Sequence, residues 1–164
     1  VEAIYDSMLS AIGKVPRQEP GGELDASRSK DRALYILTSA RSPMGLGIEI
    51  RKMFSLFGFD DSGRPIHDRD ESTTARQGLW WLNNPLPRYY ADRLAERILG
   101  RPGDAADRVT HLYLTVLGRP PGPEAETAVL TYLDELMDDG LSESDAWSRA
   151  CLGLFSTEAF QYLY

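Results

Sequence analysis

Apolar residues at helical spacing recur through the second half of the chain. One stripe consists of Val109, Leu112, Tyr113, Val116 and Leu117, and another of Val129, Leu130, Leu133, Leu136 and Met137. Residues three and four positions apart share one face of a helix, so each stripe predicts an amphipathic helix with a buried side. Only Ala33–Leu37 is apolar without this spacing, which makes it the one candidate for a short strand. The pattern therefore favours an all-α fold.

Start and stop signals divide these stripes into separate helices. Asp104 or Asp107 is placed to begin one helix, and Gly118 to close it in the left-handed conformation. Pro123 fits the first position of the next helix, where its missing N–H costs nothing. Residues 142–145 resemble a capping box with Asp in place of the usual Glu or Gln. Four ends are thus predicted from local chemistry alone.

Further helices are predicted on either side of these. They are Val1 to Ile12, Leu46 to Phe57, a helix that begins at Ser72 or Thr73 and stops at Asn83-Asn84-Pro85, and Tyr89 to Gly100. A last helix runs to Phe155, and Ser156 is expected to cap a terminal turn that holds Phe160, Tyr162 and Leu163. Residues 16–32 and 58–71 are polar and predict two long irregular loops. The expectation is one all-α domain over residues 1–164, with about six or seven helices.

Composition limits what such a domain does. Its 164 residues, 42% of them hydrophobic, suffice for one core, and 25 acidic against 18 basic residues would repel nucleic acid. No apolar run approaches the ~20 residues of a membrane span. Cys151 is the single cysteine and lies on an apolar helical stripe, so we expect a buried thiol rather than a nucleophile or metal ligand. The chain begins at Val1 inside an amphipathic segment, so we expect a C-terminal fragment of a larger protein.

Catalytic signatures are scarce. Neither a Gly-x-Ser-x-Gly elbow nor a phosphate-binding glycine pattern occurs in the sequence. His67 lies amid Asp60, Asp61, Asp68 and Asp70, so a cation-binding or acid/base loop is one interpretation of residues 58–71. A solvated acidic loop without a ligand is the interpretation that we favour. No metal or other cofactor is predicted for this chain.

Trp80 and Trp81 form the most conspicuous aromatic pair. Successive helix positions are about 100° apart, so one indole could enter the core while the other faces a partner or stacks on a sugar. Ordinary core and edge packing is the interpretation that we favour. Arg119 could pair with an acid to lock two helices or could recognise a ligand, and the structural role is favoured. The candidate ligand or partner surface comprises Trp80, Trp81, His67, Asp68, Arg64 and Arg119.

Five elements in a fixed order resemble a known family. They are Ile4–Gly13, Phe54–Gly58, a Gln-x-Leu-x-x-Leu-Asn-x-Pro signature at Gln77–Pro85, the Leu-Gly-Arg-x-Pro element at Leu117–Pro121, and the closing Leu152–Phe160. Their order and spacing are similar to the C-terminal helical domain of unknown function numbered fifteen fifty-three. That domain occurs in large exported or surface-associated proteins of planctomycetes and their relatives.

The resemblance indicates the kind of protein in which this domain occurs, but it does not indicate a reaction. Members are joined to other helical domains and frequently to a haem c-type domain, but this chain has no Cys-x-x-Cys-His motif. We therefore expect a non-catalytic helical interaction or scaffold domain of an exported bacterial protein, with other domains of the parent polypeptide as partners. The alternative is an accessory part of an enzyme that acts on complex polysaccharides, sulfated or unsulfated, with a glycan as ligand.

Overall fold

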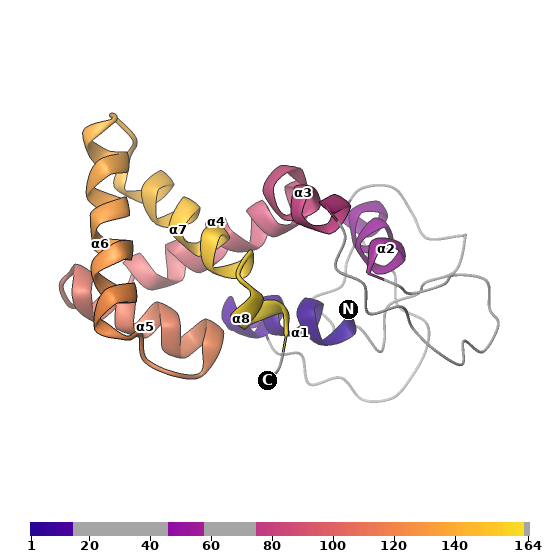
Figure 1. The fold of residues 1–164 in the computed structure, drawn as a ribbon, viewed down its shortest axis with the longest axis horizontal. Coiled ribbons are helices and arrows are strands. Elements are labelled where there is room, and N and C mark those ends of the chain that lie inside the picture. Colours follow the sequence, from indigo (N-terminus) through magenta and orange to yellow (C-terminus); the bar gives the residue numbers. More distant parts are fainter. Residues whose placement is uncertain (15–45, 58–74, 163–164) are drawn as a thin grey trace. The chain divides into compact units, whose positions relative to one another are not determined.

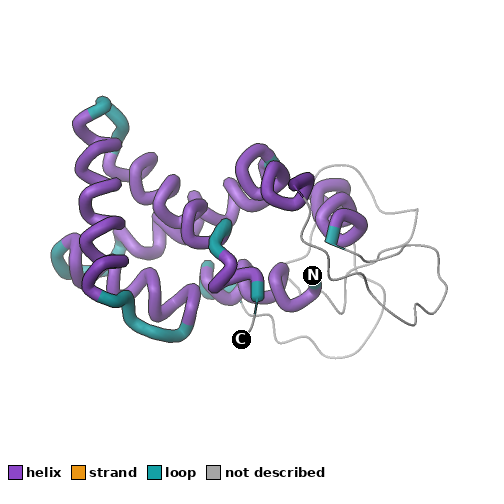
Figure 2. Tube along the Cα trace, viewed as in Figure 1, coloured by secondary structure: helices purple, strands orange, loops and turns teal. Residues whose placement is uncertain are grey.

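The computed structural model describes residues 1–14, 46–57 and 75–162, and every regular element in these ranges is a helix (Figures 1 and 2). The all-α prediction is confirmed. The helices are α1 (Glu2–Ala11), α2 (Leu46–Leu56), α3 (Ala75–Asn83), α4 (Pro85–Leu99), α5 (Ala105–Leu117), α6 (Pro123–Asp138), α7 (Glu143–Phe155) and α8 (Glu158–Gln161). The strand candidate Ala33–Leu37, the predicted loops 16–32 and 58–71, and the cap at Ser72 or Thr73 lie outside the described residues.

Two compact units make up the chain. The first runs from Val1 to Leu86 and the second from Pro87 to Tyr164, so the division falls in the first turn of α4. The expectation of one domain over residues 1–164 stays a prediction.

The first unit contains α1, α2 and α3. Its helices bury large side chains, and the ring of Tyr5 on α1 meets that of Phe54 on α2 edge-on, with centroids 6.2 Å apart. Aromatic edge-to-face pairs of this kind add to the free energy gained from apolar burial. The fully buried residues of these two helices include Tyr5, Met8, Ile50 and Met53.

The second unit confirms the predicted start and stop signals. Asp104 accepts a hydrogen bond from the backbone N–H of Asp107, whose side chain accepts one from Asp104 in return, so α5 begins with a capping box. Gly118 ends α5 at φ 69°, in the left-handed region. Pro123 stands at the first turn of α6, and Ser142 accepts from the N–H of Asp145 to begin α7. Because these interactions are local, sequence sufficed to place them.

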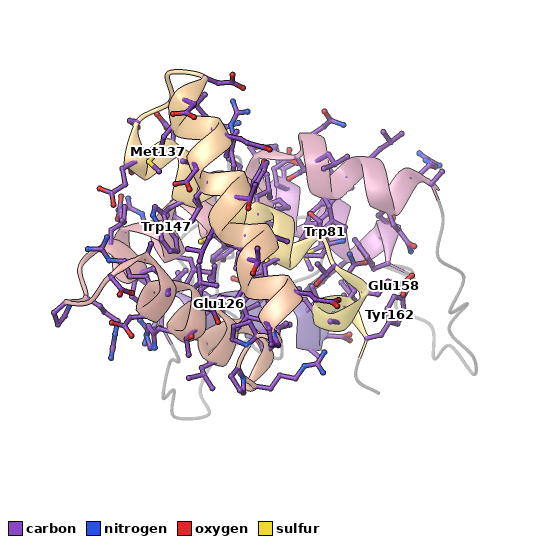
Figure 3. The ribbon with its side chains drawn as sticks, turned by 60° about the vertical axis from the view of Figure 1, so that its left-hand side comes forward. Trp81, Glu126, Met137, Trp147, Glu158 and Tyr162 are labelled. Atoms are coloured by element: carbon purple, nitrogen blue, oxygen red, sulfur yellow. The ribbon has the colours of Figure 1, made fainter. Side chains whose placement is uncertain are left out.

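The core of the second unit forms where α5 packs against α6, α7 and α8, and α7 against α6 and α8. Trp147 on α7, labelled in Figure 3, is 2% exposed. An ion pair of 3.1 Å between Arg108 and Glu143 also joins α5 to α7.

Two expectations for this unit need correction. Leu133 and Leu136 are buried as predicted, but Met137, in the last turn of α6, is 38% exposed, so the buried stripe ends before the helix does. Ser156 does not cap the terminal turn. Its hydroxyl donates to the carbonyl of Leu152, 2.8 Å away, and α8 begins after Thr157. The hydroxyl therefore satisfies the end of α7 instead.

Two glycines test the account of helix ends. A Cβ added at either Gly118 or Gly153 meets open space, but only Gly118 has a positive φ. We expect Gly118→Ala to lower the free energy of unfolding by about 1 kcal/mol, because a side chain is strained in the left-handed region. Gly153→Ala, inside α7, should raise it by about 0.5–1 kcal/mol. Denaturant unfolding measures both, and two changes of the same sign would contradict this account.

Candidate functional site

The signature helix α3 is oriented by its tryptophans. Trp80 and Trp81 are only 8% and 1% exposed, so both indoles are buried and neither is presented outward. Gln77 is buried on the same side of the helix, and Asn84, which follows it, is half-buried. These four positions have the i, i+3, i+4, i+7 spacing of one helix face. Their placement agrees with the core-packing interpretation of the tryptophan pair.

An aromatic cluster joins α3 to the end of α2. The ring centroids of Trp80 and Trp81 lie 5.1 Å apart, and that of Phe57 lies 5.6 Å from Trp80 and 6.2 Å from Trp81. All three pairs meet edge-on, the geometry that aromatic rings prefer. The buried indole nitrogen Nε1 of Trp80 has no hydrogen-bond partner among the residues that the structure describes. Apolar packing, rather than a polar contact of this indole, therefore holds Trp80 in place.

Two polar side chains of the signature connect α3 to α2. The side-chain amide of Gln77 donates to the backbone carbonyl of Leu56, at a distance of 3.1 Å. This carbonyl belongs to the last turn of α2, where helix carbonyls lack partners within their own helix. Gln77 thus supplies a donor that the helix itself does not provide.

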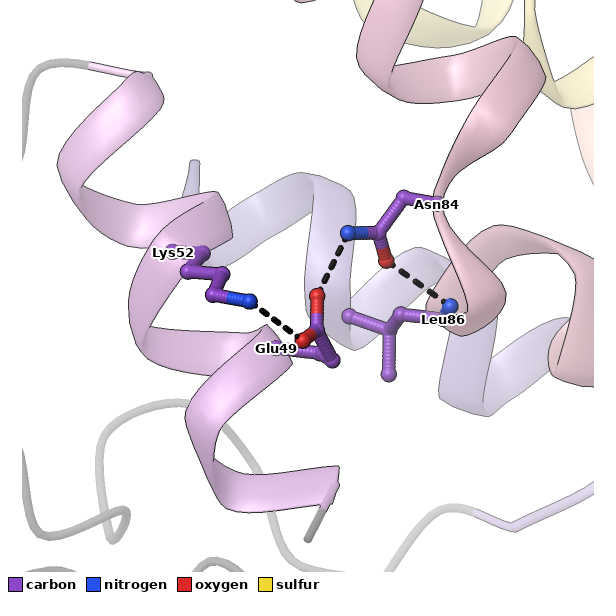
Figure 4. A network of polar contacts seen from close by, with 4 residues as sticks. All are labelled: Glu49, Lys52, Asn84 and Leu86. Atoms are coloured by element: carbon purple, nitrogen blue, oxygen red, sulfur yellow. Dashed lines mark hydrogen bonds and ion pairs between the residues drawn. The ribbon is translucent and has the colours of Figure 1, made fainter.

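Asn84 makes the second connection, shown in Figure 4. Its Nδ2 donates to a carboxylate oxygen of Glu49 at 2.6 Å, and its Oδ1 accepts from the backbone N–H of Leu86 at 2.9 Å. The second bond has the geometry of a helix cap, and Pro85 occupies the first position of α4. One side chain therefore begins a helix and also contacts Glu49 of α2.

The carboxylate of Glu49 is stabilised in its charged form. The Lys52 ammonium lies 2.7 Å away, and its hydrogen bond is the main cause that lowers the pKa of Glu49. Partial burial opposes this shift, while the amide of Asn84 lowers the pKa further. The network of Glu49, Lys52 and Asn84 thus contains an ionised carboxylate at neutral pH.

The outward side of α3 is apolar. Leu79 is 59% exposed and Leu82 66% exposed, although both belong to the leucine pattern of the signature. We define the α3 face as Ala75, Arg76, Leu79, Leu82 and Asn83, all exposed. The side-chain amide of Asn83 donates back to the backbone carbonyl of Leu79, one turn earlier, at 3.0 Å. Helical spacing alone does not distinguish this face from the buried one.

Of the other predicted site residues, the structure describes Arg119 alone. Arg119 is exposed in the turn between α5 and α6 and makes no ion pair with residues that the structure describes. Arg64, His67 and Asp68 lie outside the described residues, so their grouping stays a prediction.

Two other described side chains, those of Cys151 and His111, are of types that catalytic sites use. Cys151 is fully buried, as predicted, and burial raises the pKa of its thiol, so no thiolate forms at neutral pH. Burial, helped by Arg101 and Arg97, lowers the pKa of His111. Within residues 1–14, 46–57 and 75–162, no three His, Cys, Asp or Glu side chains are grouped as a metal site would require. None of the helices described is both long and apolar enough to cross a membrane.

Neighbouring asparagines test the role of the network. We expect Asn84→Ala to lower the free energy of unfolding by about 1–3 kcal/mol, because it removes a helix cap and a hydrogen bond to a charged group. The matched control is Asn83→Ala, which loses only an exposed contact and should change it by less than about 0.5 kcal/mol. Thermal unfolding of both variants gives the comparison. Equal losses would mean that the network adds nothing.

The pH dependence of stability tests Glu49. A carboxyl whose pKa is lower in the folded state contributes stability above its unfolded pKa and loses it as pH falls through the folded pKa. We expect Glu49→Gln to be less stable than the parent sequence at neutral pH. The difference should shrink as the pH falls below 4.5, the ordinary pKa of this carboxyl. A difference independent of pH would contradict the assignment.

Comparison with protein families gives a match over most of the chain. The family model PSD1, described as a protein of unknown function (DUF1553), matches residues 1–133, which include all of α1 to α5 and most of α6. No curated protein and no solved structure matches the chain. The matched range covers most of the 164 residues and confirms the resemblance drawn from the sequence. The chain belongs to the PSD1 family of proteins of unknown function, DUF1553.

Proposed function

We propose that this chain is a non-catalytic helical interaction domain that binds another domain of its parent polypeptide through the α3 face. The observation that supports this is the exposure of Leu79 and Leu82 on a helix whose opposite side is buried. Two exposed leucines three residues apart suit a helix-in-groove contact, in which apolar anchors recur at i and i+3.

The orientation of α3 supports the proposal. Rotation of the helix to bury its leucines would expose Trp80 and Trp81 and would break the contacts that Gln77 and Asn84 make with α2. A partner can cover the leucines without either cost. Complete burial of a leucine is worth roughly 1.5–3 kcal/mol, so two partly exposed leucines could contribute about 2–4 kcal/mol to docking.

The proposal includes the kind of parent protein in which this domain acts. By family resemblance, the parent is an exported, multidomain bacterial protein, and the role requires no cofactor in this chain. The alternative of an accessory part in an enzyme that acts on complex polysaccharides rests on the kinds of organism and protein that the resemblance implies, and a tryptophan that responds to added glycan is its test. The burial of Trp80 and Trp81 favours the interaction role over that alternative.

Calorimetric titration of this chain with the remainder of its parent polypeptide, at moderate salt, tests the proposal. We expect micromolar or tighter binding that weakens at least about tenfold in the double variant Leu79→Ser, Leu82→Ser, because polar side chains lose the burial energy. The matched control is Leu114→Ser, an exposed leucine of α5 that is 46% exposed and lies in the second unit. It should bind as the parent sequence does.

The unfolding temperature of each variant checks that the fold is intact. Exposed leucines contribute little to stability, so neither variant should unfold at a markedly lower temperature. Absence of binding, or binding that the double variant leaves unchanged, would overturn the proposal.

A further inference from the structure

The net negative charge of the chain is concentrated in one segment. Residues 120–148, which include all of α6 and the start of α7, contain eight Asp and Glu residues and no Lys, Arg or His. Because the whole chain has a net charge of -7, the remainder of the sequence, taken together, is nearly neutral. All eight acidic side chains belong to the part of the chain that the structure describes. The surface around α6 therefore has a negative potential that the rest of the molecule does not share.

The helices packed against α6 supply little positive charge to offset these acids. Both α5 and α7 pack against it, and the one arginine of α5, Arg108, is already paired with Glu143 at 3.1 Å. Arg119, in the turn before α6, lies about 16 Å along the helix axis from Asp134. This distance exceeds the screening length of about 8 Å at physiological salt. Arg149 of α7 makes no ion pair with residues that the structure describes.

Half of the acids lie at the C-terminal end of α6. We define the α6 tip as Asp134, Glu135, Met137, Asp138 and Asp139, all of them exposed. The unpaired carbonyls make this end of a helix electrostatically negative, so acids are unfavourable there. Asp134 and Asp138 are also four positions apart, where like charges repel. No basic residue occupies the last turn of α6, so nothing within the helix compensates for this arrangement.

The fold gains no side-chain contact from these carboxylates. None of the four makes an ion pair or a side-chain hydrogen bond with residues in the described ranges. They are also not grouped as a metal site would require, since no three His, Cys, Asp or Glu side chains in those ranges are. Met137, labelled in Figure 3, is 38% exposed and follows Asp134 by three positions, so an apolar group lies beside the acids. This surface suits an extended cationic partner better than a single metal ion.

We propose that the α6 tip docks a basic amphipathic helix, whose lysine or arginine side chains pair with the tip carboxylates while its apolar side covers Met137. The partner is argued from charge complementarity, because it supplies the positive charge that this end of α6 lacks. Methionine is suited to such a contact because its flexible side chain adapts to different apolar surfaces. The inference is independent of the α3 face, since it concerns another helix and another partner.

The stability of the free chain tests the first step of this argument. The tip variant Asp134→Asn, Asp138→Asn removes two unfavourable charges, and Asn and Asp have similar helix propensity, so its unfolding temperature should rise. The matched control Glu124→Gln, Glu158→Gln removes two exposed acids from the first turns of α6 and α8. Acids are favourable at that end of a helix, so the control should not rise. A lower unfolding temperature for the tip variant would mean that these carboxylates serve the fold, and would overturn the proposal.

Two synthetic helical peptides test the docking itself. Both have leucines at the same i, i+3, i+4, i+7 positions, and the flanking positions are Lys in one and Glu in the other. Calorimetric titration at about 0.15 M salt should show tighter binding of the lysine peptide to the chain. The tip variant should bind this peptide at least about threefold more weakly, and Met137→Ser should also weaken it. The control variant has the same net charge as the tip variant and should bind the lysine peptide as the parent sequence does.

The remaining outcomes each contradict the proposal. Equal binding of the two peptides, or no binding of either, would exclude a basic partner. Equal weakening in the tip and control variants would show attraction to the net charge of the chain instead of docking at the α6 tip. The double variant Leu79→Ser, Leu82→Ser should leave binding of the lysine peptide unchanged. Loss of binding in that variant alone would place the peptide at the α3 face, which would overturn this inference and leave the proposed function standing.

Discussion

The packing of Trp80 and Trp81 against the end of α2 determines the orientation of α3. Both indoles are buried and meet each other and Phe57 edge-on, so the largest apolar area of the signature lies on the inner side of the helix. Because the tryptophans turn one side of α3 inward, Leu79 and Leu82 on the opposite side stay exposed to solvent. The exposed leucines are thus a consequence of where the tryptophans pack, and the proposed docking role depends on that packing.

Polar contacts reinforce the same orientation. Gln77 supplies a donor to the last turn of α2, while Asn84 begins α4 and reaches the carboxylate of Glu49. Such contacts contribute modest net free energy, but a buried donor left without its acceptor is costly. They therefore penalise other rotations of α3 more than they stabilise the observed one. The Gln77–Pro85 segment thus has two parts. Its buried and half-buried side chains connect helices, and its exposed leucines form an outward surface.

Local chemistry made much of the fold predictable from sequence. The capping box at Asp104, the left-handed Gly118 and the proline start of α6 each depend on a few adjacent residues. The orientation of α3 could not be predicted in the same way, because Leu79 and Leu82 compete with the buried stripe that Gln77, Trp80, Trp81 and Asn84 form. Two of those four residues are polar, and only their contacts with α2 show why they lie inside. The hydroxyl of Ser156 likewise donates to the carbonyl of Leu152 at the end of α7 instead of capping α8, which the sequence pattern did not predict.

Hydroxyl-radical footprinting with residue-level mass spectrometry tests most directly which side of α3 faces solvent. Tryptophan is intrinsically more reactive than leucine, so the order of oxidation reports exposure only if the leucines react against that bias. We expect modification of Leu79 and Leu82 in the native chain, with Trp80 and Trp81 protected until the chain unfolds. Rapid oxidation of Trp80 or Trp81 in the native state, with the leucines protected, would contradict it.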